Sequence, residues 1–193
     1  MTMTRFLALV HPAAGTALIS EWLTGTPDRS RTAADAVADE WAAAEAPPGR
    51  LAQHVFLSAE GDRLLFHAQW TGDDAHLAWA RARRGEVVSR VDTLVPGIER
   101  PGLARTRLRR SVVHDAASPA ATLVLTRTAA AEAERLAAPV PGLLAAHVHV
   151  TPDGERALVI TEWATAGQAP PGERYALYRS LVDQPVRAGR DAS

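Results

Sequence analysis

The chain has 193 residues, of which 47% are apolar, and its formal net charge is −1. That length can bury one sizeable core or two small ones, and the composition is typical of a globular protein. The sequence contains no cysteine and no lysine, which excludes disulfides, thiolate nucleophiles, cysteine-ligated metals, a Walker phosphate-binding loop and a lysine Schiff base.

Neither a membrane segment nor a nucleic-acid surface is expected. The apolar run FLALV near the start is too short for the h-region of a signal peptide, and nothing in the sequence approaches a spanning helix. Arginine clusters occur at 81–84 and 105–110, but the chain has almost no net charge, so they indicate solvated faces of a helix and a strand. We therefore expect a cytoplasmic protein that binds neither membranes nor nucleic acid.

The first half of the chain predicts the order strand, helix, strand, strand, helix, strand. The first helix follows Pro27 in an alanine-rich run without breakers, and the second is expected to break at Gly85. This order is that of the ferredoxin-like split unit, in which helices cover one face of an antiparallel sheet. The predicted elements are a strand over 16–24, a helix up to Pro47, a hairpin over 47–70, a helix over 73–95 and a strand over 102–113.

The second half repeats the first in reduced form. PPGRLAQHVFLSAEGDRLLFHAQW, which ends at Trp70, aligns without a gap with VPGLLAAHVHVTPDGERALVITEW, which ends at Trp163. The shared positions include His54 and His147, which indicates an internal duplication. After the second tryptophan comes the proline and glycine linker ATAGQAPPGE, where the first copy has a helix. The second unit is therefore expected to lack its second helix.

Each unit leaves one sheet face to be buried, so we expect the two sheets to pack together within the chain as one barrel-like α+β fold. The long last strands also make a homodimer possible. The predicted organisation is an N-terminal extension over 1–15, a first unit over 16–113, a linker over 114–119, a reduced unit over 120–184 and a tail over 185–193.

The turn of the first hairpin decides which side chains share a face. A two-residue turn centred on Glu60 and Gly61 pairs Ser58 with Arg63, whereas a type I turn followed by a glycine bulge pairs Ser58 with Asp62. In the second copy the turn reads TPDG, with proline where a type I turn favours it. The bulged hairpin is therefore predicted for both copies.

This register gives each hairpin one face with distinctive side chains. His147 and His149 have the spacing of two metal ligands, but no third ligand is evident, so no metal is expected. Trp163 has no helix to cover it and is interpreted as a core residue. The predicted faces carry His54, Phe56, Leu64, Phe66 and Trp70 in the first half, and His147, His149 and Trp163 in the second.

The first face is the better candidate for a site. The helix over 73–95 can roof it and supplies His76, Trp79 and Arg90. Aromatic rings with a few convergent polar groups are typical of a ligand pocket. Arg90 fits equally well as a surface charge near the end of a helix.

The hairpin pattern, from PG through a glycine turn to QW before a helix, resembles the antibiotic biosynthesis monooxygenase superfamily of ferredoxin-like, dimeric α/β-barrel proteins. The resemblance covers 16–113 and, in reduced form, 119–182. It implies an intrachain dimeric α/β-barrel here. The superfamily includes cofactor-independent oxygenases that convert anthrones to quinones, quinol monooxygenases and haem-degrading enzymes.

The family's site residues transfer only in part. The tryptophan of the anthrone oxygenase pocket falls on Trp70, and its helix arginine falls on Arg90. The family's asparagine, hairpin histidine and helix tyrosine fall on Phe66, Phe56 and His76, which depart from the pattern. Because the chain contains no asparagine, the haem-degrading branch is a poor match.

The resemblance implies a cofactor-independent monooxygenase that oxidises an aromatic polyketide of the anthrone or hydroquinone type with O2. An electron-rich phenol that has lost its proton can pass an electron to O2 without metal or flavin, provided that the protein binds it, excludes water and stabilises the oxyanion. The missing asparagine favours a cyclase-like enzyme or a small-molecule binding protein instead, and the truncated second half favours a structural partner. In the leading hypothesis Trp70, Trp79, Phe56 and Phe66 bind the aromatic substrate, His54 or His76 accepts the proton, and Arg90 holds the negative charge.

Overall fold

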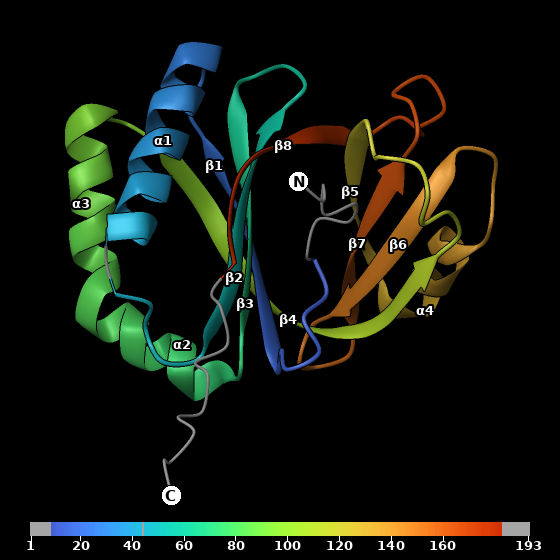
Figure 1. Cartoon of the computed structure of the whole chain (residues 1–193), viewed down its shortest axis with the longest axis horizontal. Helices are drawn as coiled ribbons and strands as arrows, with labels where there is room; N and C mark the ends of the chain where they lie inside the picture. The colour runs from blue at the N-terminus through green and yellow to red at the C-terminus, as the bar shows by residue number, and fades with distance from the viewer. Residues whose placement is uncertain (1–8, 44, 183–193) are drawn as a thin grey trace, which may run out of the picture.

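The computed structural model describes residues 9–43 and 45–182, so the predicted tail over 185–193 and the first eight residues of the predicted extension lie outside it. Eight antiparallel strands close into one barrel in the order β1-β3-β2-β8-β5-β7-β6-β4 (Figure 1). The strands are β1 (Thr16–Leu23), β2 (Arg50–Ser58), β3 (Arg63–Trp70), β4 (Glu99–Val113), β5 (Thr122–Ala129), β6 (Leu143–Val150), β7 (Arg156–Trp163) and β8 (Glu173–Val182).

The barrel consists of two ferredoxin-like sheets, as predicted. The first has the order β4-β1-β3-β2 and the second the order β8-β5-β7-β6. The last strand of each unit joins the other unit: β4 pairs with β6, and β8 pairs with β2. The long strands that suggested a homodimer therefore pair within the chain.

Helices cover the two halves unequally (Figure 1). The first sheet is covered by α1 (Pro27–Ala43) and by a second helical run, whose parts are α2 (Asp73–Trp79), the π-helical turn η1 (Ala80–Arg84) and α3 (Gly85–Leu94). In the described residues, the second sheet is covered only by α4 (Ala130–Ala133) and the 3₁₀ turn η2 (Glu134–Ala137), so its second helix is absent there, as predicted. There Ala169, from the linker, packs against Trp163.

The predicted break at Gly85 is wrong. This glycine has helical dihedral angles, φ −61° and ψ −39°, and the helical run continues through it. The irregularity lies one turn earlier, in the π-helical turn Ala80–Arg84. A glycine lowers helix propensity but does not end a helix whose other face packs against a sheet.

The predicted hairpin register is also wrong. His54 lies opposite His67 and Leu57 opposite Leu64, a register that places Ser58 opposite Arg63. The turn does have a left-handed glycine, Gly61 with φ +74°, whose N–H donates to the Ser58 carbonyl oxygen at 2.9 Å. However, the loop contains one residue more than predicted, Asp62. A shift of one residue in the pairing places the side chains of one strand on the opposite face of the sheet from the predicted one.

The correction separates the residues that were predicted to share a face. His54 and Phe56 point into the barrel, whereas Phe66 and Trp70 point outward to the helices. In the second hairpin His147 and His149 face the interior, and Trp163 lies on the opposite face. Trp163 is nonetheless buried, as its interpretation as a core residue requires.

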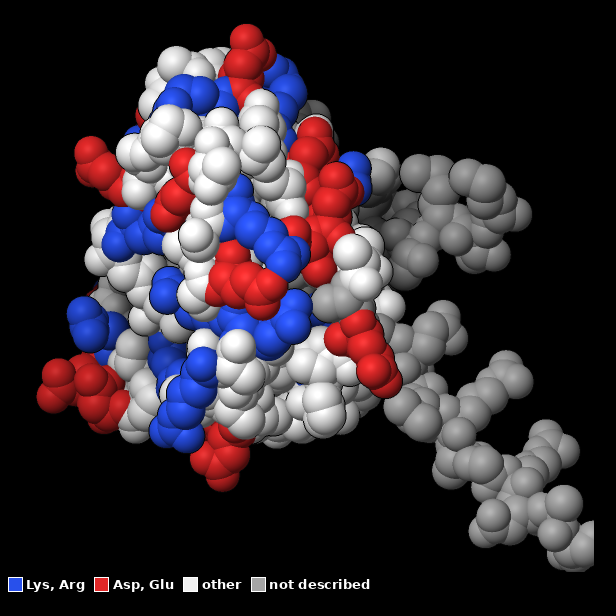
Figure 2. All heavy atoms as spheres, turned by 90° about the vertical axis from the view of Figure 1, so that its left-hand side faces the viewer, with Lys and Arg blue, Asp and Glu red and all other residues white. Residues whose placement is uncertain are grey.

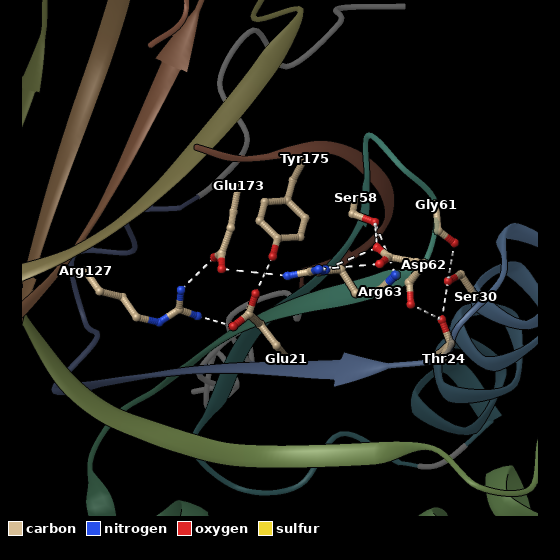
Figure 3. A network of polar contacts seen from close by, with 10 residues as sticks. All are labelled: Glu21, Thr24, Ser30, Ser58, Gly61, Asp62, Arg63, Arg127, Glu173 and Tyr175. Atoms are coloured by element: carbon tan, nitrogen blue, oxygen red, sulfur yellow. Dashed lines mark hydrogen bonds and ion pairs between the residues drawn. The ribbon is translucent and has the colours of Figure 1, made fainter. Parts of the chain in front are cut away.

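At one end of the barrel, a polar network links the two units (Figure 3). Arg127 of β5 forms ion pairs with Glu21 of β1 and, at 2.6 Å, with Glu173 of β8. Tyr175 donates a hydrogen bond to Glu21, and Arg63 of β3 lies 3.7 Å from Glu173. Burial and the bond to Glu21 raise the pKa of Tyr175, so its hydroxyl remains a donor.

In the described part of the chain, no helix is long and apolar enough to cross a bilayer.

Candidate active site

A cavity of about 170 Å³ lies between the outer face of the first sheet and the helices that cover it. An apolar cavity of about 150 Å³ holds benzene, so this one accommodates a small aromatic ring system. The rings pack closely: the centroids of Trp22 and Phe66 are 4.7 Å apart, and those of Trp70 and Trp79 are 5.7 Å apart. The aromatic walls are Trp22, Trp41, Phe66, Trp70 and Trp79.

Strand alternation and helix periodicity explain why these residues meet. Successive side chains of a strand point to opposite faces, so Phe66 and Trp70 of β3 share the helix-facing side. On α1, Val37 and Trp41 are four residues apart and lie on one face of the helix. Both are buried against the sheet and line the cavity.

Two hydrogen-bond donors in the cavity wall lack an acceptor. The indole Nε1 of Trp70 and the Nε of Arg100 are buried and have no hydrogen-bond partner in the described part of the chain. The other guanidinium nitrogens of Arg100 contact Asp92, the shorter distance being 2.8 Å, and the group lies 4.2 Å above the ring of Trp22. An unsatisfied buried donor costs about 1–3 kcal/mol, so a ligand oxygen that accepts from these groups would bind favourably.

His76 of α2 contributes a neutral imidazole. Its ring lies 5.4 Å from that of Trp70, and its Nδ1 is 3.2 Å from Nη2 of Arg105. Burial and the positive charges of Arg105 and Arg84 lower the pKa of His76 to about 4. At neutral pH the ring is therefore uncharged.

The structure brings four of the predicted site residues together and separates three from them. Trp70, Trp79, Phe66 and His76 line the cavity. Two others, His54 and Phe56, lie inside the barrel because of the register. The third, Arg90, is half exposed on the helix surface.

Arg90 forms ion pairs with Glu40 at 2.7 Å and with Glu86. Figure 2 shows this side of the molecule, where basic and acidic side chains are interspersed. Arg100, at the start of β4, supplies a guanidinium to the cavity instead. No sequence signal identified it, because it is distant in sequence from the hairpin and from the helix.

Gln53 is a second cavity residue that the sequence did not identify. Its side chain is buried, lines the cavity and lies opposite Ala68, on the same face as Phe66 and Trp70. The family's asparagine position falls on Phe66, and Gln53 provides a carboxamide from the neighbouring strand. The correct hairpin register would have placed Gln53 on this face.

The histidine that the two repeats share contacts a serine of the other unit in each case. His54 of β2 contacts Ser180 of β8 at 2.7 Å, and His147 of β6 contacts Ser111 of β4 at 2.9 Å. Each pair crosses one of the two junctions between the units, with the same residue types in the same arrangement. The repeated histidine and serine therefore lie where the barrel closes.

Two further histidines are buried between these junctions. The ring of His67 lies 5.9 Å from that of His54 and 5.3 Å from that of His149. Burial, followed by the neighbouring histidines, lowers the pKa of His67 well below its usual value, and burial lowers that of His149 to about 3. Among the described residues, no three histidine, cysteine or acidic side chains are arranged to hold a metal.

No protein-family model and no curated protein matches the sequence. Solved structures do match. An anthrone oxidase-like protein superposes with a TM-score of 0.67 at 13% identity, over 86% of this chain and 92% of that chain. The chain has the fold of this protein. The predicted fold, two ferredoxin-like units joined in one α/β barrel, is thus confirmed, and the match extends over both halves of the barrel.

Two proposed monooxygenases have more distant versions of the fold. One, from Lactobacillus acidophilus, has a TM-score of 0.50 at 10% identity, over 86% of this chain and 96% of that chain. The other, from Fusobacterium nucleatum, has a TM-score of 0.50 at 8% identity, over 80% of this chain and 78% of that chain. At these identities the comparisons establish architecture, and the activity has to be argued from the cavity.

Proposed function

We propose that the protein is a cofactor-independent monooxygenase that oxidises a small aromatic compound of the anthrone or hydroquinone type. The observation that carries this proposal is an aromatic-walled cavity with two buried N–H donors, those of Trp70 and Arg100, that lack an acceptor. The anthrone oxidase-like protein of the same fold supports it. Antibiotic or other polyketide biosynthesis is the corresponding metabolic context.

The reaction makes few demands on the protein. In an anthrone, the reacting methylene carbon becomes a carbonyl carbon, one oxygen atom of O2 enters the product and the other leaves as water. The ionised substrate supplies the four electrons that O2 accepts. The cavity walls exclude water from the ring, and the donors of Trp70 and Arg100 stabilise the oxyanion.

The test compares two arginines. O2 consumption with anthrone and dihydroquinone substrates is measured for the wild type, Arg100→Ala and Arg90→Ala. Arg100 lines the cavity and Arg90 is paired on the surface, so we expect a loss of about ten-fold or more in kcat/KM for Arg100→Ala only. The reverse result would restore the role predicted for Arg90. If the wild type consumes no O2 with any of these substrates, the proposed reaction is wrong.

One observation favours a second candidate, a non-oxidative cyclase or small-molecule binding protein. His76, the histidine in the cavity wall, has its Nδ1 engaged by Arg105 and is a weak base. Tight anaerobic binding of an aromatic ligand, without O2 uptake in air, would support this function over the oxygenase.

A further inference from the structure

The wall of the barrel has an opening beside β4. A groove of about 940 Å³ lies between the first half of β4, the end of β5 and the turn that joins β6 to β7. The ladder between β4 and β6 begins at Arg107, which lies opposite Val150. Among the described strands, the residues of β4 before Arg107 therefore pair only with β1, and the groove runs along a free strand edge.

Two residues of β4 direct their backbone groups into this groove. In an antiparallel ladder, alternate residues point their N–H and C=O groups toward one neighbouring strand and the residues between them toward the other. Thr151 donates its N–H to β7 at 2.9 Å, so the preceding residue, Val150, directs its groups toward Arg107 of β4. Leu103 and Arg105 point the same way as Arg107, and no backbone group of the described residues bonds to them on that side.

The equivalent edge in the other half of the barrel is occupied by polypeptide. In the turn of the first hairpin, the Ala59 N–H donates to the Arg174 carbonyl oxygen of β8 at 2.9 Å. Arg174 begins RYALYRSLV and Arg105 begins the matching RTRLRRSVV, so the two arginines are equivalent. The aligned hairpins place Pro152 at the position of Ala59. Proline has no N–H, so the second hairpin cannot make this bond, and the edge at Arg105 stays open.

The groove has an apolar floor and a rim with both charges. The floor consists of Ile19, Ala104 and Leu158, which belong to or pack against the apolar cluster inside the barrel. At the rim, Glu155 and Arg156 are exposed and carry opposite charges. This lining favours an uncharged chain whose alternate side chains are apolar and face the floor.

This groove is separate from the cavity under the helices. Of the β1 residues, Ile19 and Glu21 line only the groove, whereas Leu18 and Trp22 line only the cavity. Because successive side chains of a strand point to opposite faces, the groove lies on the barrel side of the first sheet. A ligand in the groove is therefore independent of the proposed function.

We propose that the groove is a docking site for an extended segment of another polypeptide, which pairs with the free edge of β4 as an added strand. Main-chain hydrogen bonds hold such strands, and pockets for alternate side chains give specificity. The edge from Pro101 to Arg105 is about 17 Å long at the rise of a strand, which matches about five residues of a partner. The partner segment is uncharged and has apolar residues at alternate positions.

A labelled peptide tests the proposal. The probe is capped Thr-Val-Thr-Val-Thr with a fluorescein label, whose residues favour strands, and binding is measured by fluorescence anisotropy. An N-methyl group is then placed on each peptide amide in turn. On the amides that face β4 it removes a hydrogen bond and should weaken binding about five-fold, whereas on the amides between them it should have little effect. No binding with a Kd below about 1 mM, or equal effects of all the N-methyl groups, overturns the proposal.

Hydrogen exchange locates the peptide on β4. With saturating peptide, exchange of the Leu103 and Arg105 amides should slow, because these groups gain a partner. Exchange of the Ala104 amide, which faces β1, should not change. Binding without this alternation overturns the proposal.

Two matched substitutions locate the site on the other wall of the groove. Ala129 is exposed at the end of β5 and lines the groove, so Ala129→Trp should fill it and prevent peptide binding. Ala59 is exposed in the first hairpin turn and does not line the groove, so Ala59→Trp should leave binding unchanged. Equal binding by the two variants would place the peptide elsewhere and overturn the proposal.

Discussion

Trp70 and Trp163 occupy the same position in the two repeats but have different environments. Trp70 ends β3, lines the cavity under α2 and has an indole N–H with no acceptor in the described part of the chain. Trp163 ends β7 and donates to Thr161 Oγ1 at 2.9 Å. It packs in an apolar cluster with Ala169 of the linker. Where the helix is lost, the linker packs against the tryptophan instead, and a donor that has no partner among the described residues in one half is satisfied within the protein in the other.

The same substitution, tryptophan to phenylalanine, can be made in the two environments. The largest expected effect is on ligand binding at Trp70. Trp70→Phe should weaken anaerobic binding of an ionised aromatic ligand by about 10–100-fold, because the bond lost is to a charged acceptor. It removes buried volume but no hydrogen bond with any described residue, so it should destabilise the fold less than the same change at Trp163.

Trp163→Phe should show the opposite profile. It removes a similar buried volume and also the bond to Thr161, so it should destabilise the fold by about 1 kcal/mol more than Trp70→Phe does, with ligand binding unchanged. Binding is measured by titration calorimetry and stability by urea unfolding. Equal effects of the two substitutions on binding would contradict the assignment of the site to the first half.

The sequence was most informative about the features that the repeats share. Duplication, strand order and the linker after Trp163 together predicted two sheets in one barrel and the missing second helix. The faces could not be predicted because they depend on the loop length, and Asp62 is one loop residue more than the expected turn contains. Nor could Arg100 be predicted, because its place in the cavity depends on how β4 pairs with β1.

The two halves also meet in the barrel interior, where a low pH should destabilise the fold. Below the unfolded-state pKa of about 6.5, an unfolded histidine takes up a proton, whereas His67 and His149 remain neutral in the fold because their pKa values are lowered. The free energy of unfolding therefore carries no penalty from these histidines above pH 6.5, and it decreases as the pH falls below this value. Each such histidine contributes a slope of about 1.4 kcal/mol per pH unit.

His67→Leu tests this contribution. Both ring nitrogens of His67 lack a partner among the described residues, so an apolar side chain of similar size should not destabilise the protein at pH 7. At pH 5 the variant should exceed the wild type by about 2 kcal/mol in free energy of unfolding. Urea unfolding at both pH values gives this difference. A variant with the wild-type pH dependence would show that His67 is not buried as a neutral ring.

The smallest expected effect is that of the two junction serines on the free energy of unfolding, and it tests whether the repeated histidine is structural or catalytic. Ser111 and Ser180 are equivalent in the repeats, and each contacts the shared histidine of the other unit across a junction. Ser111→Ala and Ser180→Ala should each lower the free energy of unfolding by about 1 kcal/mol, because each removes one hydrogen bond. The two junctions lie on different strand pairs, β4–β6 and β8–β2, so the double variant should show the sum.

Neither substitution should alter ligand binding in the cavity, since neither serine lines it. A binding defect with either alanine, at unchanged stability, would instead assign His54 or His147 to a site and would contradict a structural role for the repeated histidine.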